Sequence, residues 1–454
     1  MKINSFVSFF ILILMSGYGM TLTLVPRTVL PRNLICIPNT IPPIDLPGTY
    51  ATCAQEVAAA KNQTNPDQGK TTDQIILDNG YFLEMYNVTT DDGYILLVHR
   101  ITGGPHSPRA YGKPTVYLHH GMFGASDNWL FQNGDRNLPF KLADAGYDVW
   151  ILNVRGTTYS LGHTSLNSET DLKYWDFCWH EMGIYDIPAV LDKIEEITGN
   201  EKVYYVGYSM GTTAYFVALS EIPALNDRFI AAFMLSPVAF NGHATNPLRL
   251  IAPTLGTGEQ YLLDPILRGR IDQQYQLQRL FNVSIADICT PTAMRCGLCA
   301  NTIFAIFNYD APQMNYTNLP NILSKFPNSI SVKTLVHYTQ TMNSCLFQKF
   351  DYGILENLKR YKNIIPPSYD LSKITAKTYF FHGDYDNLAV PEDVAYTQSK
   401  MLNTTVVENI RVDWSMFNHL DFQMAKDADT LVYNQVLDLI QSIPPPPPPT
   451  SSST

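Results

Sequence analysis

The sequence is short of positive charge. Its 31 lysine and arginine residues are outnumbered by 41 aspartate and glutamate residues, so the formal net charge at pH 7 is −10. Binding to nucleic acid phosphates requires a basic surface, which this balance does not supply. The composition therefore argues against nucleic acid as a partner.

The sequence also lacks long apolar runs beyond its first 25 residues. At the N-terminus, Lys2 precedes an apolar run over 6–15 that ends in glycines and a serine. This order is typical of a secretory signal peptide, which we place at 1–19, and a signal anchor that continues through Val25 is the alternative. Because a spanning helix needs roughly 20 apolar residues, we expect no transmembrane segment in the mature protein.

Cysteine is scarce, with seven residues, and its spacing does not suit a metal site. A structural zinc site wants a pair of Cys-x-x-Cys motifs or partner histidines, and only Cys296 and Cys299 are spaced in this way. Cys296 and Cys299 are therefore a poor zinc candidate, and nothing else in the sequence implies a metal or an organic cofactor. The odd number leaves at least one cysteine free or intermolecular in an oxidising compartment. A local bridge in the region from Cys289 to Cys299 is expected, and Cys36 with Cys53 could close a second loop.

Secretion would also permit N-glycosylation. The acceptor pattern Asn-x-Ser/Thr is found on surface loops of secreted proteins. It occurs at Asn62, Asn87, Asn282, Asn315 and Asn403.

The two ends of the chain differ in composition from its middle. Residues 20–70 are rich in proline, alanine, threonine and asparagine, and we interpret them as an N-terminal arm or propeptide-like segment. Residues 444–449 are six prolines with no amides to donate and no apolar side chains to bury, and a Ser/Thr stretch follows them, so an extended solvated tail is expected over 443–454. With 45% hydrophobic and only 16% charged residues overall, the chain between has ample material for a core.

From about Tyr81 onward, short apolar runs alternate with helical patterns. One helix is expected over 187–197, where apolar residues recur with a 3.6-residue period and Gly199 follows. This alternation predicts an α/β fold, with a mostly parallel sheet and helices on both faces. The expected strands are 115–118, 147–152, 203–206, 229–235, 378–381 and 406–412.

Residues 237–369 interrupt the alternation. They contain irregular apolar and aromatic segments, and an excursion of about 130 residues is too long for an ordinary loop. We therefore predict an inserted subdomain at 237–369, between a first core part at 71–236 and a second at 370–442.

A Gly-x-Ser-x-Gly motif lies between an expected strand and an expected helix, with Ser209 at its centre. A serine on such an elbow has a strained backbone, and the flanking glycines avoid collisions with the neighbouring strand and helix. The helix N-terminus also directs free amides at a developing negative charge. We predict that Ser209 is a nucleophile, and a glycine-rich turn with a capping serine is the alternative.

A serine nucleophile needs a histidine base that is oriented by a carboxylate. In this fold the order along the chain is serine, acid, histidine. His419 follows the last expected strand and is the only histidine after His382, so it is the expected base. Asp384 and Asp386 both follow the strand at 378–381, and spacing does not choose between them as the acid.

The reaction also needs donors for an oxyanion. In this fold they are the amide after the nucleophile, here that of Met210, and an amide in the loop after an early strand, here within 117–124. That loop contains His119 and His120, of which we expect one to be buried and one to lie on the surface.

These motifs, in this order, resemble the acid lipases, the gastric and lysosomal lipase family of α/β hydrolases. The resemblance covers about residues 71 to 440. The stretches that carry it are Asp92-Gly93-Tyr94-Ile95-Leu96, His120-Gly121-Met122, Ala145-Gly146-Tyr147-Asp148-Val149-Trp150, Asn153-Val154-Arg155-Gly156, Gly207-Tyr208-Ser209-Met210-Gly211-Thr212-Thr213 and Asn418-His419-Leu420-Asp421-Phe422.

The resemblance implies a role for each candidate residue. It makes Ser209 the nucleophile and His419 the base, and it selects Asp386 as the acid because this residue precedes a Leu-Ala-x-Pro stretch. It assigns the backbone amides of Met122 and Met210 to the oxyanion hole. It also implies that the insertion is a cap and lid, whose disulfide joins Cys289 and Cys299.

The chain departs from the family pattern close to the nucleophile. The family elbow usually reads Gly-His-Ser-Gln-Gly, whereas Tyr208 and Met210 flank the serine here. The acid loop also holds a second carboxylate, Asp384. Met210 can still donate its backbone amide, so catalysis is expected to survive these changes.

The resemblance implies a secreted or lysosomal serine lipase. Its substrates would be carboxylic esters of lipids, such as triacylglycerols or sterol esters, presented at a lipid–water interface. Two alternatives stay open: an esterase for a soluble or hormone-like ester, and a catalytically idle lipid-binding protein that retains the fold.

Overall fold

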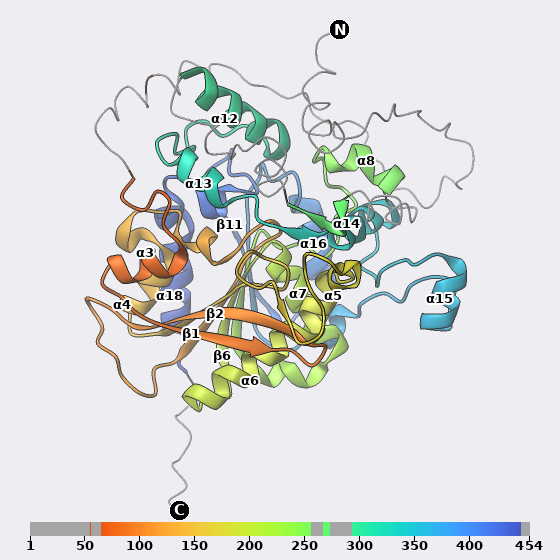
Figure 1. The fold of residues 1–454 in the computed structure, drawn as a ribbon, viewed down its shortest axis with the longest axis horizontal. Helices are drawn as coiled ribbons and strands as arrows, with labels where there is room; N and C mark the ends of the chain where they lie inside the picture. The colour runs from red at the N-terminus through yellow and green to blue at the C-terminus, as the bar shows by residue number, and fades with distance from the viewer. Residues whose placement is uncertain (1–54, 56–64, 256–266, 273–292, 446–454) are drawn as a thin grey trace, which may run out of the picture. The chain divides into compact units, whose positions relative to one another are not determined.

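A mostly parallel β-sheet lies at the centre of the fold (Figure 1). The computed structural model describes residues 55, 65–255, 267–272 and 293–445. Neighbouring strands follow the order β1-β2-β4-β3-β6-β7-β10-β11, and β5 pairs with β2 beside this path. The strands are β1 (Phe82–Thr89), β2 (Tyr94–Gly103), β3 (Thr115–His119), β4 (Asp148–Leu152), β5 (Gly162–His163), β6 (Val203–Tyr208), β7 (Phe229–Leu235), β10 (Thr378–His382) and β11 (Val406–Arg411).

The strands from β4 to β11 in this order run parallel, whereas β1 and β2 join antiparallel. Every residue of β3, β4 and β6 is buried, because helices cover both faces of the sheet there. The carboxyl ends of parallel strands meet at one edge, which is where side chains that follow different strands come together.

Helices pack on the two faces of the sheet (Figure 1). Along β3, Tyr117 belongs to the apolar cluster that includes α6, α7 and α16, whereas Val116 and Leu118 belong to the cluster that includes α3, α4 and α18. This alternation follows from the two-residue period of a strand. These helices are α3 (Thr72–Asp78), α4 (Leu138–Asp144), α5 (Trp179–Glu181), α6 (Ile187–Thr198), α7 (Met210–Glu221), α16 (Pro391–Ser399), α17 (Asp421–Met424) and α18 (Asn434–Ser442).

The predicted α/β architecture is confirmed, and each of the six expected strands appears with bounds shifted by at most two residues. The expected helix at 187–197 is α6, which ends at Gly199 with a left-handed φ of 73°. The β1–β2 hairpin was not predicted. Its turn contains Gly93 at φ 98°, a conformation that favours glycine.

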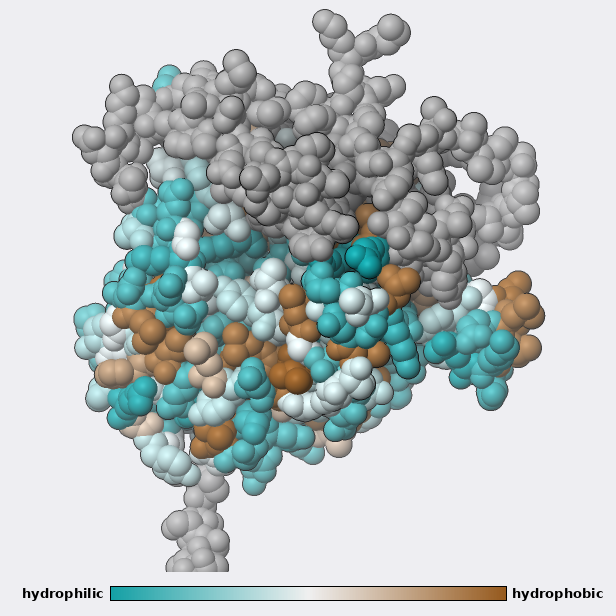
Figure 2. Space-filling view, viewed as in Figure 1, coloured by the Kyte–Doolittle hydropathy of each residue, from teal (hydrophilic) through white to brown (hydrophobic). Residues whose placement is uncertain are grey.

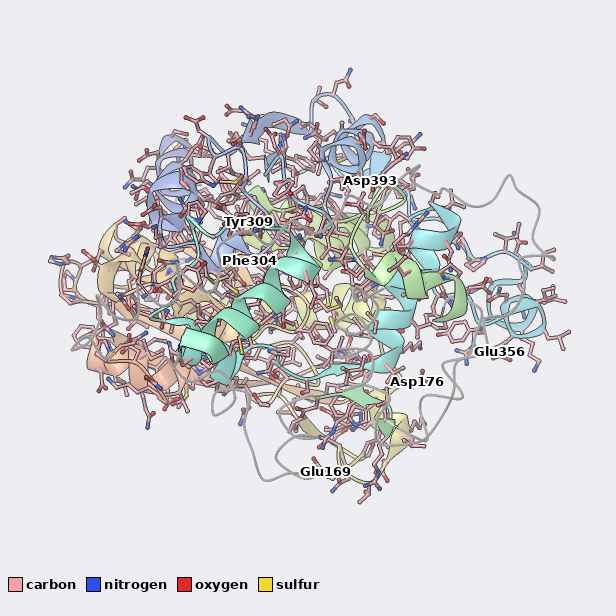
Figure 3. All side chains as sticks on the ribbon, turned by 90° about the horizontal axis from the view of Figure 1, so that it is seen from above. Glu169, Asp176, Phe304, Tyr309, Glu356 and Asp393 are labelled. Carbon is pink, nitrogen blue, oxygen red and sulfur yellow. The ribbon has the colours of Figure 1, made fainter. Side chains whose placement is uncertain are left out.

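Residues 237–369 contribute elements outside the main sheet. They include a two-stranded sheet, in which Arg270 pairs with Ser331, and a separate apolar cluster around Phe304. Seen from above, Phe304 and Tyr309 lie near the middle of the view, whereas Glu356 on α15 lies at its edge (Figure 3). The described elements here are α8 (Leu248–Leu255), β8 (Arg270–Ile271), α12 (Ala293–Phe307), α13 (Leu319–Lys325), β9 (Ile330–Ser331), α14 (Val332–Ser344) and α15 (Ile354–Tyr361).

The described cysteines fall into two states. Cys178 is buried and free, which confirms the expected unpaired cysteine, and Cys299 and Cys345 are each in a disulfide. Cys36, Cys53 and Cys289 lie outside the described residues, as do the predicted signal peptide, nearly all of the arm and most of the tail. In the described ranges, no helix combines the length and apolar character required to cross a bilayer.

Candidate active site

Ser209 stands at a sharp turn between β6 and α7. Its backbone has φ 50° and ψ −114°, a region that residues with a side chain rarely adopt. The Ser209 amide donates to the carbonyl oxygen of Leu235 at 3.0 Å, which ties the turn to β7. A strained backbone persists only where surrounding contacts hold it, and such positions cluster at functional sites.

The glycines on either side of Ser209 are required by close packing. A Cβ atom at Gly211 would lie 2.4 Å from the carbonyl oxygen of His119 on the neighbouring strand β3. A Cβ atom at Gly207 would lie 2.8 Å from a ring carbon of Tyr205 and 3.1 Å from the carbonyl carbon of Gly211. These contacts confirm the collisions that the elbow motif predicts.

His419 lies on the loop after β11 and faces Ser209. Its Nε2 atom is 2.8 Å from the Ser209 hydroxyl oxygen. The Tyr208 hydroxyl donates to the His419 carbonyl oxygen at 2.8 Å, so Tyr208 holds the backbone of His419 in place. For Nε2 to accept the Ser209 proton, the imidazole proton must be on Nδ1.

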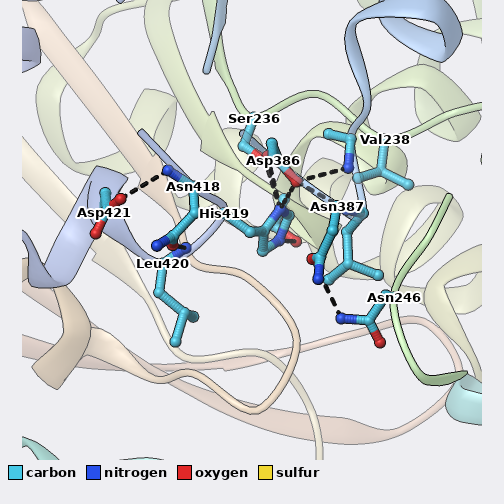
Figure 4. Close-up of polar contacts among 12 residues, drawn as sticks. Ser236, Val238, Asn246, Asp386, Asn387, Asn418, His419, Leu420 and Asp421 are labelled. Carbon is cyan, nitrogen blue, oxygen red and sulfur yellow. Dashed lines mark hydrogen bonds and ion pairs between the residues drawn. The ribbon is translucent and has the colours of Figure 1, made fainter. Parts of the chain in front are cut away.

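Asp386, on the loop after β10, faces the other side of the imidazole (Figure 4). Its two carboxylate oxygens lie 3.1 and 3.0 Å from His419 Nδ1. Burial opposes ionisation, but the charge and hydrogen bonds of His419, with hydrogen bonds from Ser236 and the Leu388 amide, hold the pKa of Asp386 below its usual value. The competing Asp384 instead accepts a hydrogen bond from Arg411 at 2.7 Å.

Two backbone amides are placed near Ser209. Met210 is the first residue of α7, where a helix leaves its amides without intrahelical partners. Met122 lies in the turn closed by the Gly124 amide, which donates to the Gly121 carbonyl oxygen at 3.1 Å. A Cβ atom at Gly121 would lie 3.0 Å from Ser209 Cβ, so this turn packs directly against Ser209.

Both histidines of that loop are buried, so the expectation of one surface histidine was wrong. His120 Nε2 accepts a hydrogen bond from the Val154 amide at 3.1 Å. Its Nδ1 faces the Gly121 carbonyl oxygen at 2.8 Å. Burial lowers the pKa of His120 to about 4 and that of His119 to about 3, so both rings are neutral at pH 7. His120 thus anchors the turn through its ring, a role that its position after a buried strand did not reveal.

Sequence analysis also missed Ser236. Its hydroxyl oxygen lies 2.5 Å from Asp386 Oδ2 and 2.7 Å from His419 Nδ1 (Figure 4). Its position along the chain could have identified it, because Ser236 directly follows β7. The sheet edge at the end of β7 is also where Ser209 and Asp386 follow their strands.

The predicted glycosylation sites lie away from Ser209 along the chain. Asn87 and Asn403 are exposed, Asn315 is half-buried, and Asn62 and Asn282 lie outside the described residues. Within the described ranges, no group of three or more histidine, cysteine, aspartate or glutamate side chains is arranged to hold a metal ion.

Comparison with known proteins shows which family models and which proteins this chain is similar to. Residues 72–133 match the model of the partial alpha/beta-hydrolase lipase region, and residues 114–276 match the alpha/beta hydrolase fold. Lipase 3 of Drosophila melanogaster is 36% identical over 81% of this chain and 92% of its own. Lipase member K of Homo sapiens is 34% identical over 84% and 93%, and the gastric triacylglycerol lipase of Rattus norvegicus is 34% identical over 83% and 93%.

Proposed function

The chain belongs to the acid lipase family of α/β hydrolases and is a carboxylic ester hydrolase that acts on lipid esters, and we propose that it works through an acyl-enzyme on Ser209. The observation that carries the proposal is the 2.8 Å approach of the Ser209 hydroxyl to His419 Nε2, with Nδ1 of the same ring against the buried Asp386. Nucleophile, base and orienting acid are thereby in hydrogen-bond reach of each other.

In the proposed reaction, Ser209 Oγ attacks the ester carbonyl carbon while its proton passes to His419 Nε2. Asp386 stabilises the imidazolium that forms, and the amides of Met122 and Met210 donate to the oxyanion. The tetrahedral intermediate then collapses, the C–O bond of the ester breaks, and His419 protonates the leaving alcohol. Water, activated by His419, attacks the acyl-enzyme and releases the fatty acid.

For the substrate, we infer triacylglycerols or sterol esters. The name of the gastric triacylglycerol lipase, which shares 34% of its aligned residues with this chain, supports the former. The nucleophile site itself makes no distinction, because the proposed roles of Ser209, His419 and Asp386 involve only the ester group.

We also infer that the protein works at a lipid surface, and α15 supports this inference. The helix and the segment after it expose five large aliphatic side chains, each at least half exposed, which form the apolar cluster where α15 lies at the edge of Figure 2. A contiguous exposed apolar patch marks an interaction site, and an insoluble lipid ester is the partner that this activity supplies. The cluster consists of Ile354, Leu355, Leu358, Ile364 and Ile365.

A secreted or lysosomal location is inferred as well. Disulfides at Cys299 and Cys345 suit an oxidising compartment, and the sequons at Asn87 and Asn403 are exposed. A mass decrease on glycosidase treatment of the protein from a eukaryotic host, smaller in Asn87→Gln and in Asn403→Gln than in the parent, is the expected result.

The catalytic proposal is tested by fatty acid release from emulsified triolein between pH 4 and 8. The parent should be active, and Ser209→Ala should reduce the rate to the uncatalysed level. Thr213→Ser, a change on α7 that keeps a hydroxyl, is the matched control. Equal activity in Ser209→Ala and the parent would contradict the proposal.

The surface proposal is tested with the double variant Leu355→Ser/Leu358→Ser. It should lose most of its activity on emulsified triolein and keep the parent rate on a soluble short-chain ester. Leu172→Ser/Leu402→Ser, which changes two exposed leucines away from α15, is the control. Parent activity of the α15 variant on the emulsion would exclude α15 as the contact surface.

A further inference from the structure

We propose that Ser236 is a positioning residue for the reaction, because its hydroxyl bridges Asp386 and His419 and fixes the imidazole for proton exchange with Ser209. The inference rests on the proposed function, in which these three residues form the acyl-transfer site. It adds a second serine to that site and assigns it a role distinct from that of the nucleophile.

The backbone places Ser236 between the strands that carry Ser209 and Asp386. It directly follows β7, which lies between β6 and β10 in the sheet, and Leu235 is in register with both Tyr208 and Phe381. The Ser236 amide donates to the Phe381 carbonyl oxygen at 2.9 Å. Four consecutive strands of the sheet therefore each contribute one polar residue at the same edge.

Ser236 has an unusual backbone for a residue with a side chain. Its φ of 50° lies in the left-handed region, which Ser209 also occupies. Ser236 is fully buried, so its hydroxyl is out of contact with bulk solvent and bonds to the neighbouring polar atoms. Surrounding contacts hold this strained conformation, and it aims the side chain at the acid and the base.

The hydrogen-bond roles at Ser236 follow from its single proton. Asp386 is a carboxylate and can only accept, so the Ser236 hydroxyl donates to Oδ2 at 2.5 Å. Its lone pairs then face His419 Nδ1 at 2.7 Å and require a proton on that nitrogen. The ring tautomer in which Nε2 is free to accept the Ser209 proton is thereby selected.

Ser236 is also a principal partner of the buried acid. Asp386 Oδ1 accepts from the amides of Leu388 and Ala389, both at 2.9 Å, whereas among the described residues Oδ2 accepts only from Ser236 and His419. Ser236 Oγ lies closer to Nδ1 than either carboxylate oxygen does. Loss of the hydroxyl would leave one buried oxygen with the imidazole as its single partner, and both groups would be less well oriented.

The first test measures kcat and KM on a soluble short-chain ester for Ser236→Ala and Ser236→Gly. Both should lower kcat about tenfold, the effect of one hydrogen bond to a charged group, and leave KM within about twofold. Glycine tolerates a φ of 50°, so the pair separates loss of the hydroxyl from backbone strain. The matched control is Ser220→Ala, a buried serine on α7, which should keep the parent kcat.

The second test asks whether Ser236 acts through the acid and the base. In an Asp386→Asn background, removal of the Ser236 hydroxyl should lower kcat by less than about threefold, because residues that act as a unit are not additive. The low-field proton resonance of His419 Nδ1–H should shift in Ser236→Ala and stay in place in Ser220→Ala. Unfolding midpoints of all variants identify any that fail to fold, and Ser236→Gly then replaces Ser236→Ala.

Parent kcat in both Ser236 variants, a change in KM alone, or full additivity with Asp386→Asn would overturn the inference. These results differ from failure of the proposed function. If Ser209→Ala kept the parent activity, the acyl-enzyme would be excluded. If Ser209→Ala were inactive and the Ser236 variants were fully active, only the role of Ser236 would be excluded.

Discussion

Replacement of Arg155 by methionine should be among the most destabilising single changes in this protein. The guanidinium is fully buried and lies between two carboxylates, with nitrogen–oxygen distances of 2.5 Å to Asp92 and 2.6 Å to Asp186. It also stacks 4.1 Å from the centre of the Tyr94 ring. The change to methionine keeps an apolar stem of similar length and removes the charge.

The expected cost depends on which carboxylate is left unpaired. Asp92 is 24% exposed and can be rehydrated, whereas Asp186 is fully buried. Breaking a buried ion pair by removing one partner typically costs about 3 to 5 kcal/mol. We expect a loss of this size in the free energy of unfolding at pH 7.

The loss should be smaller at acidic pH. Burial raises the pKa of Asp186 to about 6 even beside Arg155. A carboxyl whose pKa is higher in the folded than in the unfolded state stabilises the fold as pH drops, by about 1.4 kcal/mol per pH unit between the two pKa values. Without Arg155 the folded pKa of Asp186 rises further, so between pH 7 and 5 the variant should regain more stability than the parent, whose own gain is about 1 kcal/mol.

Urea unfolding at pH 7 and pH 5, followed by tryptophan fluorescence, measures both quantities. Arg360→Met, which removes an exposed cation paired with Glu356, is the control and should leave the unfolding free energy nearly unchanged. A loss below about 1 kcal/mol for Arg155→Met at pH 7, or an equal loss at both pH values, would refute the reasoning.

Three further changes have defined outcomes. Tyr208→Phe removes the donor to the His419 carbonyl oxygen, so kcat on a soluble ester should fall about fivefold with KM nearly constant; an unchanged kcat would show that this bond does not position the base. Gly211→Ala places a Cβ atom 2.4 Å from the His119 carbonyl oxygen, so loss of activity and a lower melting temperature are expected. The control is Gly112→Ala, at an open left-handed position, which should cost about 1 kcal/mol of stability. Similar melting temperatures for the two variants would contradict the packing argument. Burial raises the pKa of Asp421, and it raises the pKa of Asp310 to about 6, so the parent should lose stability as pH rises from 5 to 8. Asp421→Asn should make this pH dependence of stability shallower. A steeper dependence in the variant would exclude the two carboxyls as its source.

The parallel part of the fold was accessible from the sequence because its strands are buried on both faces. Such strands are short continuous apolar runs, as at β3, β4 and β6, and the amphipathic α6 between them ends at a glycine. The antiparallel β1 is different: most of its residues are exposed or half-buried, so its sequence carries little apolar signal.

The site was only partly accessible from the sequence. Spacing did not choose between Asp384 and Asp386, because both follow β10 closely, and tertiary contacts with Arg411 and His419 distinguish them. Ser236 has no motif of its own. Its role depends on the order of strands in the sheet, which local sequence does not encode.

Two of the motif stretches contact each other in the structure. The stretch that begins at Asp92 and the stretch that contains Arg155 are 63 residues apart, and the Arg155 guanidinium joins them. They appeared as separate family signatures in the sequence, and in the fold they are joined by one ionic contact.

Labelling with a fluorophosphonate, followed by peptide mapping, tests the acyl-enzyme most directly. The account predicts one label per chain, on Ser209, and strongly reduced labelling in His419→Ala. Absence of label on Ser209 in the folded, ester-hydrolysing parent would contradict the account.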